Sequence, residues 1–411
     1  MSERTTCVVV GGGPAGMVLG LLLARAGVEV TVLEKHGDFL RDFRGDTVHP
    51  STLRLLDELG LGERFATLPQ SRMEKIVVPI GDDDEVTIGD LRRLRTPHPY
   101  IAIAPQWDLL NLLAEAAAEE PTFRLRMRAE VTGLIREDGA VRGVRYRGDD
   151  GETELRADLT VAADGRWSIA RRDADLAPKE IPVPIDVWWF RLGRKSGETE
   201  NTLTPRMRGG RMAIVVPREG YYQLAYVAKK GIDAQLREAG IEHFREEVAA
   251  VLPMFADRVG ELESMEQVKH LDVRLNLLRR WHVDGLLCIG DAAHAMSPIG
   301  GVGVNLAVQD AVAAATLLAD PLRRGRVSPA GLAKVRTRRL APTLLVQALQ
   351  RLLHRTVAAP VVNGKRLGPP KPMVALLRRV PQASFIPAYL IGIGLRPERA
   401  PEFARRSARS S

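Results

Sequence analysis

The chain is poor in cysteine and in aromatic residues, and it lacks an unbroken apolar run of membrane-spanning length. Of its 411 residues only two are cysteines, and 5% are aromatic. Cys7 and Cys288 each lie in an apolar, strand-like stretch, so we expect two core thiols and neither a disulfide nor a metal site. The longest apolar candidate, between Arg379 and Arg396, contains two prolines. The opening residues "MSERTTCVVV" do not have the pattern of a secretory signal, so a cytoplasmic location is expected.

Acidic residues are scarce in the C-terminal part. Residues 321–411 contain nineteen Lys and Arg but only two acids, Glu398 and Glu402, so this part is strongly basic while the rest is mildly acidic. Such a segment can contact nucleic acid, an anionic membrane surface or an acidic protein. Because it lacks a nucleic-acid motif and interleaved aromatic residues, we expect no nucleic-acid partner. A solvated basic helical face is favoured over membrane-surface contact.

What the chain does have is a glycine-rich turn in a βαβ pattern at its start, "TTCVVVGGGPAGMVLGLLLARAGVEVTVLEKH". The apolar run 7–10 predicts a strand, residues 17–26 a helix, and residues 28–33 a second strand that Glu34 ends. Between the first strand and the helix the pattern G-x-G-x-x-G is formed by Gly11, Gly13 and Gly16. A lone glycine pattern is weak evidence, but strand, helix, strand and acid together predict a dinucleotide site.

Each part of this unit has a physical role in such a site. Gly11 permits the tight turn, Gly13 lets the backbone approach a pyrophosphate at the positive end of the helix, and Gly16 allows close helix–strand packing. Glu34 can accept hydrogen bonds from a ribose. No third classical strand follows Glu34; an arginine-containing loop does, with Arg44, and this suits FAD better than NAD. Arg44 could also be an ordinary surface residue.

Two further strand ends carry a carboxylate. "LTVAADG" ends at Asp164, and "GLLCIGDAAH" ends at Gly290-Asp291. In an open α/β sheet this is the edge at which ligands lie. Both aspartates could instead be helix N-caps. The second is followed by "MSPIGGVGVNLAVQDA", where glycines and a proline precede a helical pattern; that cluster could also be a simple turn.

These motifs resemble those of the FAD-dependent aromatic hydroxylases, the single-component flavoprotein monooxygenases typified by p-hydroxybenzoate hydroxylase. Three segments carry the resemblance, in order and spacing over most of residues 1–330: "GGGPAG" with Glu34, "AADGRWSIAR", and "IGDAAHAMSPIGGVGVNLAVQDA". The resemblance implies an α/β fold with an FAD-binding Rossmann-like domain of the GR2 type. It also implies an interleaved β-sheet substrate domain and a helical C-terminus.

The resemblance implies cofactor-binding roles for particular residues. The ADP half of FAD would be held by Gly11, Gly13, Pro14, Ala15, Gly16, Glu34 and Lys35, with Val131 at the adenine. Arg44 and Gln106 would contact the flavin and the ribityl region. Asp164 would serve the pyrophosphate side and the nicotinamide cofactor. The ribityl chain and the isoalloxazine would meet Gly290, Asp291, Pro298, Gly301, Val302, Gly303, Val304 and Asn305, where glycines keep side chains away from a flat ring and the following helix adds its positive end.

The catalytic and substrate residues are less determined by the sequence. Some phenol-hydroxylating relatives have an aspartate at the position of Asp46, where it could take a phenolic proton; "RGDT" also fits a loop in which Asp46 bonds its own backbone. His294 fits a structural role better than a catalytic one. In the strand-like segments of the middle region, the substrate candidates are Trp189, Met212 and Tyr222. Alternation turns only half of such residues inward, and the sequence does not say which half.

The predicted organisation is discontinuous: residues 1–70, 100–175 and 270–330 bind FAD, residues 71–99 and 176–269 form the substrate domain, and residues 331–411 form a C-terminal helical segment. The resemblance implies that NADH or NADPH reduces the flavin and that oxygen then adds at its C4a position. The resulting hydroperoxide inserts one oxygen atom into a small aromatic or polyketide-like substrate. A reductase, dehydrogenase or halogenase of the same superfamily, or a non-catalytic FAD-fold binding protein, is the alternative. The expected partners are a small hydrophobic substrate and O2, and the chain would be a monomer or homodimer.

Overall fold

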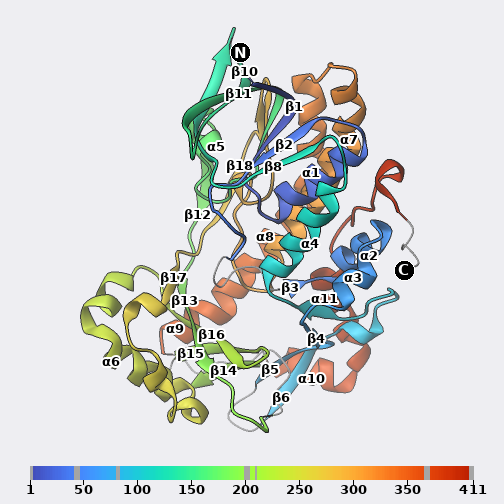
Figure 1. Cartoon of the computed structure of the whole chain (residues 1–411). Helices are drawn as coiled ribbons and strands as arrows, with labels where there is room; N and C mark the ends of the chain where they lie inside the picture. The colour runs from blue at the N-terminus through green and yellow to red at the C-terminus, as the bar shows by residue number, and fades with distance from the viewer. Residues whose placement is uncertain are drawn as a thin grey trace.

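The computed structural model describes residues 3–40, 47–79, 84–198, 204–208, 211–364 and 371–406. Its upper body is built on one large sheet in the order β19-β20-β11-β1-β2-β8, with β9 and β10 attached to β11 (Figure 1). The strands are β1 (Glu3–Val10), β2 (Val30–Leu33), β8 (Phe123–Arg126), β9 (Glu130–Glu137), β10 (Ala140–Gly148), β11 (Gly151–Ala162), β19 (His282–Val283) and β20 (Leu286–Cys288). The central strands β8, β2, β1, β11 and β20 run parallel.

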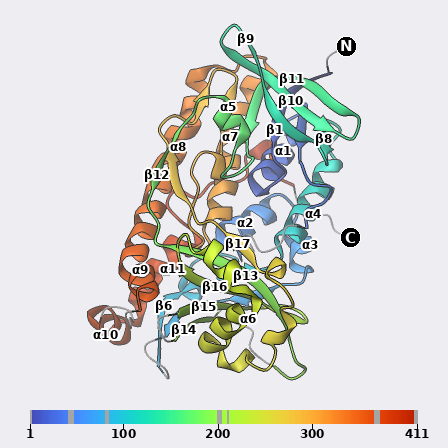
Figure 2. The ribbon, with the colours of Figure 1, turned by 90° about the vertical axis from the view of Figure 1, so that its left-hand side faces the viewer.

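The parallel strands are buried on both faces, which explains their continuous apolar sequences. Residues 7–10 of β1 and all of β2 and β20 are buried, including the free thiols of Cys7 and Cys288, as predicted. One face is covered by α1 (Pro14–Arg25), which packs between α4 (Gln106–Ala118) and α7 (Gly303–Arg323). α8 (Pro329–Leu353) packs on the outer side of α7. β9 and β10 continue the sheet from β11, and the short α5 (Ile169–Asp173) packs against β9 (Figure 2).

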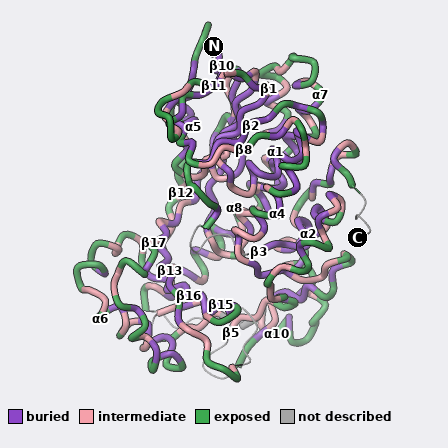
Figure 3. The backbone as a smooth tube through the Cα atoms, in the orientation of Figure 1, coloured by how far each residue is buried: buried purple, intermediate pink, exposed green. Residues whose placement is uncertain are grey.

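A second, antiparallel sheet forms the lower body, in the order β14-β15-β16-β13-β17. Its strands are β13 (Ile185–Gly193), β14 (Thr204–Arg208), β15 (Arg211–Pro217), β16 (Tyr221–Lys229) and β17 (Lys269–Leu271). One face packs under α6 (Asp233–Val251) with a core that includes Trp188 and Phe190. The opposite face is turned toward the upper body. Figure 3 shows that the strands of both sheets are mostly buried, whereas much of α6 is exposed.

Small sheets connect the two bodies. They are formed by β3 (Thr47–Val48), β4 (Ser71–Met73) and β7 (Ile101–Ile103), by β5 (Lys75–Pro79) with β6 (Glu85–Asp90), and by β12 (Pro178–Ile181) with β18 (Leu275–Leu278). Two helices, α2 (Pro50–Glu58) and α3 (Gly62–Ala66), follow β3. The β5–β6 hairpin contacts β14 of the second sheet as well as the C-terminal helices.

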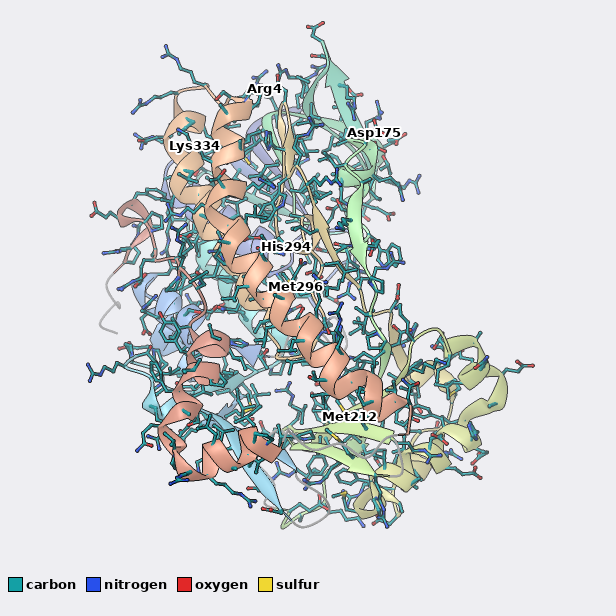
Figure 4. All side chains as sticks on the ribbon, turned by 180° about the vertical axis from the view of Figure 1, so that it is seen from behind. Arg4, Asp175, Met212, His294, Met296 and Lys334 are labelled. Atoms are coloured by element: carbon teal, nitrogen blue, oxygen red, sulfur yellow. The ribbon has the colours of Figure 1, made fainter. Side chains whose placement is uncertain are left out.

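The C-terminal part is helical, as expected. After α8 the chain continues through a π-helical turn (His354–Ala358) into α9 (Ala359–Val362), α10 (Lys371–Arg379) and α11 (Phe385–Gly392). α8 runs along the back of the molecule from the upper body to the second sheet (Figure 4). Within the described residues, no helix is both long and apolar enough to cross a membrane.

Candidate functional site

The predicted motifs meet at one edge of the large sheet because their strands end level with one another. Val10 of β1 pairs with both Leu33 of β2 and Ala162 of β11, and Ala162 pairs with Cys288 of β20. The residues that follow these strand ends are therefore neighbours: Gly11, Glu34, Asp164, Gly290 and Asp291. Segments from four parts of the sequence thus supply one ligand-facing edge.

The first glycine turn has the shape that a dinucleotide needs. Gly11 has a φ of +101°, and a Cβ there would lie 2.6 Å from the carbonyl oxygen of Ala163. A Cβ on Gly16 would lie 1.9 Å from the carbonyl oxygen of Gly11, so α1 can approach β1 only without a side chain there. By contrast, a Cβ on Gly13 would meet nothing within 4 Å. The N-terminus of α1 is therefore open on this side, where a phosphate would approach it.

Glu34 is buried at the end of β2 and is held in place by backbone groups. Its Oε2 accepts from the N–H of Gly12 at 2.8 Å, and its Oε1 accepts from the N–H of His36 at 3.0 Å. The backbone N–H of Ala129 donates to the Glu34 carbonyl at 2.9 Å, which brings the start of β9, with buried Val131, beside this carboxylate. Lys35 is exposed.

Asp164 binds the start of α5 without being the N-cap of that helix, and one of its carboxylate oxygens stays without a partner among the described residues. Its Oδ2 accepts from the N–H groups of Ile169 and Ala170 at 2.8 and 3.3 Å, at the start of α5, whose N-cap is Ser168. Its Oδ1 is buried and has no hydrogen-bond partner among the described residues. Burial raises the pKa of this carboxyl, against the opposing effect of the hydrogen bonds from Ser168 and the backbone. An unpartnered buried oxygen at the ligand edge fits a hydroxyl or N–H donor of a bound cofactor.

Asp291 lies in a short 3-10 turn, Gly290–Ala292, and is partly exposed. Its Oδ2 is 3.5 Å from Nη2 of Arg166, which comes from the Asp-Gly motif 125 residues earlier in the chain. Gly290 packs closely between α1 and α7: a Cβ on Gly290 would lie 3.5 Å from Cβ of Ala15 in α1 and 3.1 Å from Cβ of Ala307 in α7. The two carboxylate motifs are thus directly linked, which their separation in sequence could not reveal.

The loop 298–302, called the glycine loop below, leads into α7, which begins at Gly303. Gly301 has a φ of +63°, and its carbonyl oxygen accepts from Thr47 Oγ1 at 2.9 Å. The same oxygen is 3.0 Å from Nε2 of His49, whose Nδ1 is 2.8 Å from the carbonyl oxygen of Ile391 in α11. His49 is fully buried. The sequence did not single out this histidine, which joins the glycine loop to the C-terminal helices.

Asn305 is oriented by the same segment. Its Oδ1 accepts from the hydroxyls of Ser51 and Thr52, at 2.8 and 2.7 Å, and the side chain is buried. The N-terminal turn of α7 is therefore fixed relative to α2. Val302 is buried, whereas Pro298, Gly301, Gly303 and Val304 keep intermediate exposure at the helix start.

His294 belongs to a buried ionic network. Its Nε2 is 2.5 Å from Oδ2 of Asp310, which also accepts from the N–H of Gly290 at 3.1 Å. Asp310 Oδ1 accepts from Nε of Arg339 at 3.0 Å, and Arg339 lies 3.5 Å from Glu398. Burial alone would raise the pKa of Asp310, but His294 and Arg339 outweigh it and hold this pKa below its ordinary value. This network supports the structural role expected for His294, because it holds Gly290 in place from behind.

The three substrate candidates do not share a face of the second sheet. Trp189 and Met212 pack with Ile299 of the glycine loop, together with Val187, Ala225 and Val227. Tyr222 lies on the other face, in the core under α6, with its ring 4.9 Å from that of Phe255. This placement separates Tyr222 from the glycine loop, so we do not retain it as a substrate contact.

The remaining predicted residues lie at the entrance of α4 or outside the described part of the chain. Gln106 is the first residue of α4 and is buried. Its neighbour Trp107 lies 6.0 Å from the guanidinium of Arg191 on β13. Arg44 and Asp46 lie outside the described residues. Thr47, which follows them, touches Gly301 and pairs with Ile103 of β7.

The residues that are described fit FAD. The open turn at Gly13, the buried carboxylate of Glu34 and the unpartnered Oδ1 of Asp164 form an edge with acceptors for sugar hydroxyls and N–H groups for phosphates. The glycine loop and the N-terminus of α7 then provide a surface without large side chains for a flat ring, and a positive helix end for its negative charge.

The comparisons with known proteins agree. A family model described as FAD binding domain matches residues 4–347. The 6-methylpretetramide 4-monooxygenase of Streptomyces rimosus is 36% identical over 390 residues, which cover 94% of this chain and 90% of that enzyme. The protoasukamycin 4-monooxygenase of Streptomyces nodosus subsp. asukaensis is 27% identical over 339 residues, 79% of this chain and 81% of that enzyme. The structure of anhydrotetracycline hydroxylase from Streptomyces rimosus superposes with a TM-score of 0.77 at 25% identity, over 97% of this chain and 78% of that chain.

Fold and site together define a flavoprotein with a Rossmann-like cofactor edge and a second sheet that faces it. The chain belongs to the FAD-binding family that the matching model describes, and it is an FAD-dependent monooxygenase that uses NAD(P)H. The predicted fold class and family are confirmed. The individual binding and catalytic roles, and the domain boundaries, remain predictions.

Proposed function

We propose that this monooxygenase hydroxylates a fused-ring aromatic substrate of the polyketide type, held between the glycine loop and the inner face of the second sheet. The observation that carries this proposal is the apolar face on which partly exposed Trp189 and Met212 pack against buried Ala225 and Val227, in the same hydrophobic cluster as Ile299. A planar apolar ring system fits such a face, because Trp189 and Met212 would lose their remaining contact with water when the ring binds. The 36%-identical relative, named for a reaction on 6-methylpretetramide, supports the same substrate class.

The same face of the sheet becomes polar toward α4. Arg191 pairs across the strands with buried Gln223, and its guanidinium lies 5.0 Å from the Tyr221 ring. Burial raises the pKa of Asp108 in α4, against the opposing effect of the positive charge of Arg218, which is also buried. We propose that this end receives the oxygen substituents of the substrate, whose negative or polar character suits guanidinium and amide donors. The apolar end would then receive the hydrocarbon rings.

The chemistry divides between the cofactor and the protein. Bound FAD supplies electron transfer from NAD(P)H and the activation of O2 for oxygen transfer. The chain positions the substrate against the glycine loop, excludes water with the apolar sheet face, and stabilises negative charge with the N-terminus of α7. Asp46 stays a proposed base for a phenolic proton, and Arg44 a proposed flavin contact.

A surface for NAD(P)H lies beside the Asp-Gly motif. Trp167 is 58% exposed, although it is a large aromatic residue. The guanidinium of Arg274 lies 3.9 Å from its ring centroid, and Arg166 next to it reaches Asp291. We propose that this pair binds the nicotinamide cofactor, the ring by stacking and the guanidinium by contact with phosphate. Trp167→Ala should raise the KM for NAD(P)H by about tenfold, for a stacking loss of ~1–1.5 kcal/mol, while the Kd for FAD stays unchanged; an unchanged KM would contradict this role.

The proposed function is tested by product analysis. The FAD-loaded chain is incubated with NADPH or NADH, O2 and a panel of fused-ring polyketide phenols, with single-ring phenols for comparison, and the products are identified by mass. We expect a gain of one oxygen atom on a fused-ring substrate and coupled NAD(P)H oxidation. Trp189→Ala should weaken coupling, whereas Tyr222→Phe should not. Turnover of single-ring phenols only would contradict the proposed substrate class.

A further inference from the structure

Exposed apolar side chains gather on the C-terminal helices. Of the twelve large apolar side chains exposed in the described part of the chain, nine lie between residues 344 and 395, so the distribution is strongly uneven. Within this group the most exposed are Ile386 at 61%, Leu352 at 56% and Leu376 at 54%. The others are Leu344, Leu345, Val380, Phe385, Tyr389 and Leu395. Scattered exposed leucines are normal in a folded protein, but a concentration of this kind marks an interaction surface.

On α8 the exposed apolar residues follow the helix period. Ala341, Leu345, Ala348 and Leu352 are exposed and are spaced by four, three and four residues, so they form one stripe on the solvent side. The inner side of α8 also carries apolar residues, and these are buried: Leu332 and Val335 belong to the main core. A helix at a protein surface normally presents polar side chains outward. This second, outward stripe therefore has no role in the core.

The stripe and the last helices lie on the same side of the molecule. Figure 2 shows α8, α9 and α10 along one side. α8 and α11 lie on either side of a small cavity, which is lined by Pro342 and Val346 of α8 together with Leu390, Ile391 and Leu395. α10 and α11 both contact β6. The exposed apolar groups therefore lie on helices that are linked to one another, α8 to α11 by this cavity and α10 to α11 by β6.

The charged side chains that flank these groups along α8, the π-helical turn and α10 are basic, although Arg378 of α10 is paired with the exposed carboxylate of Asp84. Arg351 on α8 and Arg355 in the π-helical turn flank Leu352, and Arg379 lies between Leu376 and Val380; all three are exposed. The sequence of α8 contains no acidic residue. Glu398, one of the two acids after residue 320, is buried and bound to Arg338 and Arg339. We call the nine apolar residues together with Arg351, Arg355 and Arg379 the apolar–arginine surface.

We infer that the apolar–arginine surface docks the enzyme on an anionic lipid bilayer. A symmetric contact between two copies would bring two arginine-bearing surfaces of the same sign together, which is electrostatically unfavourable. A bilayer with anionic headgroups offers negative charge for the arginines and an apolar layer for the leucine, isoleucine and phenylalanine side chains at the same time. This is peripheral docking, consistent with the lack of a spanning helix among the described residues. The inference does not depend on the proposed substrate.

The experiment measures sedimentation of the FAD-loaded full chain with sucrose-filled vesicles. One set is pure phosphatidylcholine, and the other contains about one third phosphatidylglycerol. We expect binding to the anionic vesicles that falls as salt rises. Each basic group near such a surface contributes about fivefold in partitioning, from ~1 kcal/mol per Arg, so Arg351→Gln with Arg379→Gln should weaken binding about 25-fold. Leu352→Ser with Leu376→Ser should weaken it at least about fivefold at unchanged charge.

Matched controls separate this surface from net charge and general stickiness. Arg323→Gln with Arg324→Gln removes the same charge from the far end of α7. Met254→Ser removes an exposed apolar side chain from the lower body next to α6. Both controls should bind anionic vesicles like the unaltered chain, and FAD content and NAD(P)H oxidation should be the same in all variants.

Three results would overturn the inference. The first is equal binding, or none, to the two kinds of vesicle. The second is an equal loss in the charge control, which would indicate net charge alone. The third is vesicle-independent self-association in sedimentation velocity that the Leu352/Leu376 variant abolishes, which would assign the surface to contact between copies. Because the readout is binding, failure of the proposed hydroxylation would not change any of these outcomes.

Discussion

At the scale of single residues, Asp291 and His294 are close in sequence but differ in what they hold. Asp291 is partly exposed at the ligand edge, whereas His294 is buried against Asp310 and Trp281. Asp291→Ala should therefore weaken FAD binding by ~1.5–3 kcal/mol, the worth of a charge-assisted hydrogen bond, without lowering the melting temperature of the apoprotein. His294→Ala should lower that melting temperature, because Asp310 and Arg339 lose a buried partner. Titration of apoprotein with FAD and thermal unfolding distinguish the two; a reversed pattern would contradict both assignments.

Asp46 is the residue whose role bears most directly on the chemistry. If it takes a phenolic proton, Asp46→Asn should leave FAD affinity and flavin reduction unchanged while hydroxylation falls. NAD(P)H oxidation would then end in hydrogen peroxide, because oxygen is activated without an electron-rich substrate ring to receive it. Product yield and peroxide are measured together across pH. An unchanged yield at every pH would leave Asp46 as a turn residue.

Local sequence was sufficient for residues whose role follows from their own strand end. Gly11, Gly16 and Glu34 occupy the positions that the first motif predicted, because a strand, a turn and a helix fix them within a short stretch of chain. Local sequence could not predict contacts between distant segments, such as the contact between Arg166 and Asp291, which are 125 residues apart in the chain. The alternation of side chains along β16 does not show which of its two faces is turned toward the glycine loop. In the structure Tyr222 lies on the opposite face, under α6.

At the scale of elements, the glycine loop depends on a segment that no motif marks. His49 is placed between the carbonyl oxygens of Gly301 and Ile391, so it joins the loop before α7 to α11. His49→Ala removes both contacts, and the loss of ~1–3 kcal/mol of buried hydrogen bonding should loosen the loop and weaken FAD binding. His36→Ala is the matched control, because that side chain is exposed beside Glu34 and only its backbone N–H binds the carboxylate.

The readout for His49 is the FAD titration together with the fluorescence of bound flavin. A looser loop should increase the fluorescence of bound flavin in His49→Ala but not in His36→Ala. Equal affinities in the two variants would show that the loop holds its shape without the histidine. The sequence could not predict this bridge, because Gly301 and Ile391 lie 252 and 342 residues beyond His49 in the chain.

At the scale of the whole molecule, the order of the elements was predictable and their assembly was not. The repeated strand–carboxylate pattern predicted the discontinuous cofactor edge, because parallel strands that end level must bring their following residues together. The sequence of residues 331–411 predicted helices but no contact of those helices with the rest of the chain. In the structure they close the back of the site: Arg339 and Glu398 complete the network behind Gly290, and α11 contacts His49. That role depends on tertiary packing alone.

Buried His49 and His354 and half-buried His282 link the stability of the whole fold to pH. Burial lowers the pKa of His49, against the opposing effect of its two carbonyl contacts, and burial also lowers the pKa of His282 and His354. Below the ordinary histidine pKa of about 6.5 the unfolded chain binds protons that the folded chain does not. The free energy of unfolding should therefore fall as pH drops below about 6.5, by ~1.4 kcal/mol per pH unit for each such proton, and be insensitive to these groups above it.

Urea unfolding at a series of pH values measures this dependence of the free energy of unfolding on pH. The variant His354→Gln removes one of the titrating groups and so shows its contribution. His354 Nε2 lies 2.9 Å from Ser297 Oγ, and a glutamine amide can make that contact without titrating. The variant should lose stability less steeply between pH 6.5 and pH 5.5 than the unaltered chain, by the slope of one proton. His243→Gln, at an exposed position on α6, should leave the slope unchanged. If the His354 variant follows the same curve as the unaltered chain, the proton taken up on acid unfolding does not go to His354.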